Sequence, residues 1–127
     1  MRSAVAKTFR DARILREATD QNGRYDAAKI AKLLDWNLAD VATYLGRDPS
    51  TISRFGASVV HQEKLAALAY LAQEVFLLMN DDLPVTRAWF RTPLRVLDGV
   101  SPQHAILRGD FVKVSSLVSE SRSGLAL

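Results

Sequence analysis

Residues 38–57 read LADVATYLGRDPSTISRFGA, and this stretch decides the fold. Small Ala42 lies four positions before Gly46, and branched Ile52 lies six positions after that glycine. Two short helices that cross steeply need a small residue at their contact, a glycine that accepts a positive φ at the turn, and an apolar plug on the second helix. The spacing therefore predicts a helix-turn-helix. Its apolar set is completed by Val41, Leu45 and Phe55.

The second helix of this motif is expected to begin at Pro49 or Ser50, with Asp48 as its N-cap. In a helix-turn-helix, the first residues of the second helix reach base edges in the major groove of DNA. Arg54 has the planar guanidinium that distinguishes guanine, whereas hydroxyl groups bind phosphates or several bases. The segment resembles the DNA-binding unit of the Xre-type regulators in both spacing and composition. The candidate DNA-binding residues are Arg47, Ser50, Thr51, Ser53 and Arg54.

Helical periodicity continues on both sides of the motif, and no alternating run is long enough for a β-sheet. Helices are expected over about 4–18, 26–36, 62–79, 83–91, 102–108 and 111–120. Four polar residues stand where N-caps belong: Asp26, Asp82, Ser101 and Asp110. The predicted fold class is all-α. We expect a helix-turn-helix bundle in residues 1–60 and a small helical dimerisation domain in residues 61–127.

Composition limits the classes of protein that fit this chain. With 127 residues and 48% hydrophobic content it can bury a core, and its lack of cysteine excludes a disulfide framework and fits the cytoplasm. Residues 1–16 carry five basic residues but lack the apolar core of a signal peptide, so they are expected to stay in the mature protein. Residues 65–79 hold 13 apolar residues, yet a membrane helix needs about 20. A buried helix or a subunit interface is the interpretation.

Positive charge is concentrated in the first half of the chain. The formal charge is +3, and residues 1–56 account for all of it, because residues 57–127 hold equal numbers of acidic and basic side chains. A phosphate-facing surface is therefore expected in the first half. One protomer offers few base contacts, so a homodimer that reads two half-sites is expected if the chain binds DNA.

Enzyme chemistry finds little support. His61 and His104 are far apart in the sequence and show no metal-ligand spacing, so both are expected to be surface or capping residues. Asp98, Ser101 and His104 crowd around a helix start without the strand-turn-helix context of a nucleophilic serine. There is no glycine-rich phosphate loop. The prediction is a protein without catalytic activity, cofactor or metal.

The second half resembles a known family. Trp89 is followed by Thr92-Pro93, and about a dozen residues later Ser101-Pro102 is followed by Ile106-Leu107 and Gly109. These elements are similar to the toxin-binding domain of the Xre/MbcA/ParS antitoxins, and with the first half the resemblance covers about residues 25–127. Trp89 itself is expected to be a core residue.

The resemblance implies that this chain is an antitoxin and that residues 61–127 form its toxin-binding domain. The partner would be a RES-domain toxin, an enzyme that degrades NAD. The antitoxin would also bind its own operator DNA for autoregulation. The resemblance also implies that the C-terminal end covers the active site of the toxin. A short apolar tail with a free carboxylate could lodge in a pocket built for an anionic dinucleotide. The serines within residues 115–123 suggest a frayed end to the last helix. The toxin-contacting residues carried over by position are Arg122, Gly124, Leu125, Ala126 and Leu127.

Two other functions stay open at the level of sequence. One is a stand-alone helix-turn-helix transcription regulator whose second half dimerises or senses a ligand. The other is a protein-binding scaffold whose helix-turn-helix no longer contacts DNA. A toxin gene beside this one favours the antitoxin over the regulator, and salt-dependent retention on DNA would exclude the scaffold.

Overall fold

The computed structural model describes residues 12–55 and 59–123, except for the side chains of residues 53–55 and 59. Within these ranges the chain is helical, and its extended pairs are two isolated bridges, Thr19 with Tyr25 and Leu94 with Val100. The predicted all-α fold is confirmed. The helices are α2 (Arg13–Glu17), α3 (Ala27–Leu34), α4 (Leu38–Leu45), α5 (Pro49–Phe55), α6 (Gln62–Leu78), α7 (Leu83–Arg91), α8 (Pro102–Leu107) and α9 (Phe111–Arg122), with short 3-10 turns η1 (Val59–His61) and η2 (Arg95–Leu97).

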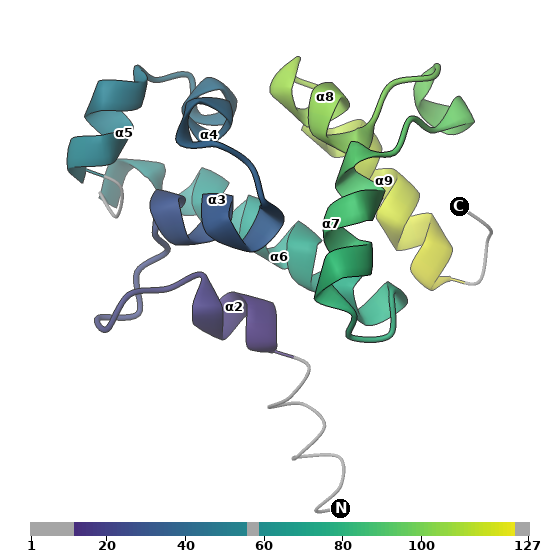
Figure 1. Ribbon diagram of the computed structural model, residues 1–127, viewed down its shortest axis with the longest axis horizontal. Helices are drawn as coiled ribbons and strands as arrows, with labels where there is room; N and C mark the ends of the chain where they lie inside the picture. Colours follow the sequence, from purple (N-terminus) through teal and green to yellow (C-terminus); the bar gives the residue numbers. More distant parts are fainter. Residues whose placement is uncertain (1–11, 56–58, 124–127) are drawn as a thin grey trace, which may run out of the picture.

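Figure 1 shows α3, α4 and α5 on one side and α7, α8 and α9 on the other, with α6 running behind both groups. Helix α6 packs against α2, α3, α7 and α9, so its neighbours come from both halves of the chain. No helix in the described part is long and apolar enough to cross a membrane. The boundary expected at residue 60 falls within η1, and α6, which follows it, contacts helices of both halves.

Helix α6 is the centre of the hydrophobic core, as its apolar composition suggested. Its side chains on several faces are buried because different neighbours cover them, while Tyr70 and Leu77 stay exposed. Most of the apolar side chains of residues 65–79, which were considered for a subunit interface, are therefore buried by contacts within the same chain. The buried apolar residues of α6 are Leu65, Leu68, Ala69, Leu71, Ala72, Val75 and Phe76.

Of the four N-caps predicted outside the helix-turn-helix, three are confirmed. The carboxylate of Asp26 accepts hydrogen bonds from the backbone N–H groups of Ala28 and Lys29. Asp82 and Ser101 cap α7 and α8 in the same way. Each satisfies backbone donors that the first turn of a helix leaves without an intrahelical acceptor.

The prediction for Asp110 was wrong. Its side chain makes no capping hydrogen bond to α9, and instead accepts one from Nε of Arg108 at 2.7 Å. A guanidinium two residues away competes with the backbone N–H groups for the same carboxylate, and its charge makes that hydrogen bond the stronger one.

Two further expectations are corrected at the ends of helices. The serine-rich end of α9 was expected to fray, yet the helix continues to Arg122 and the hydroxyl of Ser121 donates to the carbonyl of Leu117 at 3.0 Å. His61 was expected to be a surface or capping residue; it occupies the N-cap position of α6, but its side chain is buried and makes no capping hydrogen bond. The helix expected over about 4–18 is described only as α2, since residues 1–11 lie outside the described ranges.

Polar side chains tie segments that are distant in the sequence. Oε1 of Gln73 on α6 accepts hydrogen bonds from the backbone N–H groups of Ile14 and Leu15, at 2.8 and 3.2 Å. Arg87 of α7 donates from Nε to the carbonyl of Leu33, at the C-terminal end of α3, at 2.8 Å. Helices α2 and α7 are thus anchored to α6 and α3 by directional bonds as well as by apolar contact.

Candidate functional site

The turn between α4 and α5 has the geometry that the sequence predicted. Gly46 has a φ of 69°, in the left-handed region, and the N–H of Arg47 donates to the carbonyl of Ala42 at 2.9 Å. Such a bond across a left-handed residue ends a helix while satisfying one of its free carbonyls. Ala42 and Ile52 are each 1% exposed, so the small contact residue and the apolar plug are both in place.

The candidate DNA-binding residues lie around the start of α5. Arg47 and Ser50 are exposed, and Thr51 is partly buried. Ser53 and Arg54 belong to α5, but their side chains lie outside the described set. The structure therefore brings these five positions into one turn and the helix that follows it.

A capping box that sequence reasoning missed fixes the start of α4. Oδ1 of Asn37 accepts from the N–H of Asp40 at 2.8 Å, and Oδ2 of Asp40 accepts from the N–H of Asn37 at 3.3 Å. An asparagine three residues before an acidic residue is the signal that could have revealed it. Oδ2 of Asp40 also accepts from Nε2 of Gln103 at 3.1 Å, which connects the motif to α8.

Tyr44 and Lys64 connect the helix-turn-helix to α6 by two reciprocal hydrogen bonds. The hydroxyl of Tyr44 donates to the carbonyl of Lys64 at 2.7 Å, and Nζ of Lys64 donates to the carbonyl of Tyr44 at 2.8 Å. The same ammonium lies 4.9 Å from the centre of the Tyr44 ring, a cation-π distance. Burial raises the pKa of Tyr44 to about 12. Sequence reasoning had assigned neither residue a role.

Beside this pair lies a largely apolar groove of about 540 Å³ between α4, α6, α8 and the start of α9. Tyr44 and Ile106 line it, with Phe111 at the α9 end and Lys64 at a polar edge. The rings of Tyr44 and Phe111 are 5.8 Å apart. The groove joins the motif to the second half of the chain, and no single stretch of sequence shows it.

The candidate toxin-contacting end is described as far as Ser123. Nη1 of Arg122 lies 3.3 Å from Oε1 of Glu74, so the last turn of α9 is paired with α6. Both side chains keep access to solvent, which limits the strength of the pair. Gly124, Leu125, Ala126 and Leu127 lie outside the described residues.

The family-like elements of the second half have structural roles. Trp89 is buried, as predicted, and its ring meets Phe90 edge to face at 5.1 Å. The hydroxyl of Thr92 donates to the carbonyl of Ala88 at 2.7 Å, at the end of α7. The hydroxyl oxygen of Ser101 caps α8 by accepting a hydrogen bond from the backbone N–H of His104 at 3.1 Å. This contact therefore involves the backbone of His104 and not its imidazole. These residues shape α7 and α8, and α8 packs against both α7 and α9.

Comparison with known proteins adds one likeness in fold. A chain of the crystal structure of the M. tuberculosis MbcT–MbcA toxin–antitoxin complex superposes with a TM-score of 0.60. The two chains share a fold. The superposition covers 80% of this chain and 94% of that chain, at 19% sequence identity. Neither the protein-family models nor the curated proteins gave a match.

Proposed function

We propose that this chain is the antitoxin of a toxin–antitoxin pair, and that its partner is a RES-domain toxin that degrades NAD. The observation that carries the proposal is the likeness in fold to a chain of a toxin–antitoxin complex, which extends over 94% of that chain. The elements around Trp89 and Ser101 support it, because they resemble the toxin-binding domain of the Xre/MbcA/ParS antitoxins.

Neutralisation is proposed to occur at the C-terminal end of α9. Arg122 and the segment from Gly124 to Leu127 would cover the active site of the toxin and exclude its substrate. The packing of α9 against α6, to which Arg122 adds an exposed ion pair with Glu74, supports this role because it sets where the segment begins. A fixed starting point lowers the entropy lost when a short segment is ordered on binding.

The proposed second activity is operator binding by a homodimer in the cytoplasm. The turn geometry at Gly46 and the exposure of Arg47 and Ser50 support it. A stand-alone transcription regulator is the alternative, since the same helix-turn-helix geometry favours it equally. The two functions differ in whether the chain protects cells from a toxin.

The test is co-expression with a RES-domain toxin encoded beside this gene, with growth and cellular NAD as readouts. The full chain should restore both, and deletion of Gly124–Leu127 should abolish protection. Lys113→Ala, an exposed change at the other end of α9, is the matched control and should protect fully. Protection by the deletion variant would contradict the role of the segment, and absence of protection by the full chain would contradict the antitoxin function itself.

Operator binding is measured on the same proteins by mobility shift. Arg54→Ala should weaken binding by roughly 1 to 3 kcal/mol if the guanidinium of Arg54 forms bidentate hydrogen bonds with a guanine base. Unchanged affinity would remove Arg54 from the candidate contacts.

A further inference from the structure

A second pocket, away from the groove beside Tyr44, lies between α2, α3 and α7 and has a volume of about 410 Å³. Five cationic side chains from these three helices line it, with Glu17 as the acidic residue of the lining. The formal charge of this lining, +4, exceeds the +3 of the whole chain. The cationic residues are Arg13, Arg16, Lys29, Lys32 and Arg87.

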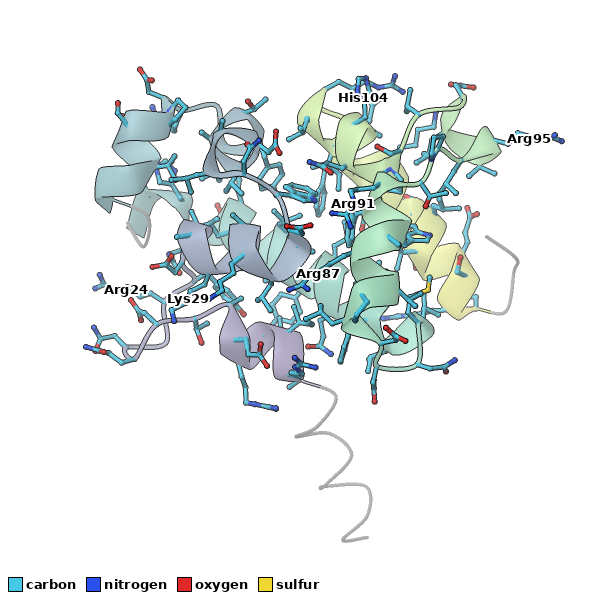
Figure 2. All side chains as sticks on the ribbon, viewed as in Figure 1. Arg24, Lys29, Arg87, Arg91, Arg95 and His104 are labelled. Carbon is cyan, nitrogen blue, oxygen red and sulfur yellow. The ribbon has the colours of Figure 1, made fainter. Side chains whose placement is uncertain are left out.

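The charge is assembled from residues far apart in the sequence. Figure 2 shows Lys29 at the lower edge of α3 and Arg87 between α3 and α7, and both residues line the pocket. Arg87 is held there by the carbonyls of Leu33 and Lys32, to which its Nε and Nη2 donate at 2.8 and 3.3 Å. These carbonyls form the negative end of the α3 dipole, which would repel an anion. Arg87 covers that end and replaces it with positive charge.

Two lysines in the lining have no counter-charge among the described residues. Nε of Arg13 pairs with Glu17 at 2.7 Å, which uses the carboxylate of the lining. Lys29 and Lys32 are exposed, and their ammonium groups make no hydrogen bond or ion pair within the described part of the chain. They are three residues apart on one helix, so they face the same side and repel each other. An anion between them and Arg87 would relieve that repulsion.

We propose that this pocket binds a compact polyphosphate, such as the diphosphate or triphosphate group of a nucleotide. Its volume falls within the range of small-molecule sites, about 300 to 1,000 Å³. Several cationic side chains from three helices suit a ligand with closely spaced negative charges, and both arginine and lysine bind phosphate in proteins. A duplex presents its phosphates along a convex surface, which a pocket fits less well. This inference goes beyond the proposed antitoxin function and stands independently of it.

The experiment measures binding of inorganic pyrophosphate to the full chain by calorimetry, together with the thermal midpoint at increasing pyrophosphate. The wild type should bind saturably, and its midpoint should rise, because a ligand that binds the folded state stabilises it. The double variant Lys29→Ala/Lys32→Ala should bind at least about tenfold more weakly, since two charged contacts are lost. Lys113→Ala, which removes one exposed lysine from α9, should bind like the wild type.

A second set of measurements uses a short DNA duplex of arbitrary sequence. It distinguishes binding of a free polyphosphate from binding of the phosphates of a DNA backbone. Pyrophosphate binding that the double variant loses, while its far-ultraviolet circular dichroism stays that of the wild type, supports the pocket. Absence of pyrophosphate binding, or equal binding by the double variant, overturns the proposal. Duplex binding that weakens in the double variant without any pyrophosphate binding overturns it in favour of a contact to the DNA backbone.

Discussion

At the scale of single residues, Tyr44 makes the stability of this protein sensitive to alkaline pH. Burial raises its pKa from 10.0 to about 12, because the phenolate is poorly solvated at the junction of α4 and α6. The folded state therefore holds the proton more tightly than the unfolded state. The stabilisation is fully present below pH 10 and is lost as the pH rises from 10 to 12, by an amount on the order of 2 kcal/mol.

The variant Tyr44→Phe separates this effect from simple packing. It keeps the ring but removes the hydroxyl that donates to the carbonyl of Lys64, so it should cost about 1 kcal/mol near neutral pH. Its loss of stability between pH 10 and 12 should be smaller than that of the wild type, as measured by urea unfolding. Tyr25 contributes to both proteins, since burial and the neighbouring Tyr70 raise its pKa as well. Equal losses in the two proteins would contradict the assignment to Tyr44.

At the scale of elements, the turn between α4 and α5 depends on one backbone conformation. Gly46 has a φ of 69°, and a Cβ added there would meet no atom within 4 Å. The cost of Gly46→Ala is therefore conformational and should be about 1 kcal/mol in urea unfolding. Gly46→Asn should cost less, because asparagine tolerates the left-handed region better. Similar costs for both variants would mean that something other than φ limits this position.

Helix ends were the part of the fold that local sequence predicted best. Caps such as Asp26 and Asp82 satisfy backbone donors two or three residues away, so a short window contains all the relevant chemistry. Local sequence gave the wrong prediction for Asp110, because its carboxylate accepts a hydrogen bond from the side chain of Arg108 instead of from the backbone N–H groups of α9. It missed Asn37, although its partner Asp40 is only three residues away.

At the scale of the whole molecule, α6 makes the two halves depend on each other. Leu68 is completely buried, so Leu68→Ala should cost roughly 2 to 5 kcal/mol. Because α6 packs against α2, α3, α7 and α9, amide exchange in α3 and α9 should accelerate together in this variant. Leu77→Ala on the exposed side of the same helix is the matched control and should change stability by less than about 1 kcal/mol. Two separate unfolding transitions would contradict a shared core.

Contacts between distant segments could not be predicted from the sequence. The hydrogen bond between Gln73 and Ile14 joins residues 59 positions apart, and that between Arg87 and Leu33 joins residues 54 apart. Neither pair follows a repeating pattern. The hydrogen bond between Arg87 and Leu33 brings Arg87 into the basic pocket. The distribution of charge along the sequence predicted a phosphate-facing surface in the first half, and therefore it did not include Arg87. The groove beside Tyr44 was missed for the same reason.

The aromatic contacts around Phe90 give this protein an intrinsic optical probe. Trp36, which follows α3, and Trp89 of α7 both meet the ring of Phe90 edge to face, at 6.0 and 5.1 Å. They are the two tryptophans of the chain, and both are buried. All indole emission therefore originates at the junction of α3 and α7. Its wavelength and intensity can report on the separation of these helices in solution, without a label, during unfolding or on addition of a ligand.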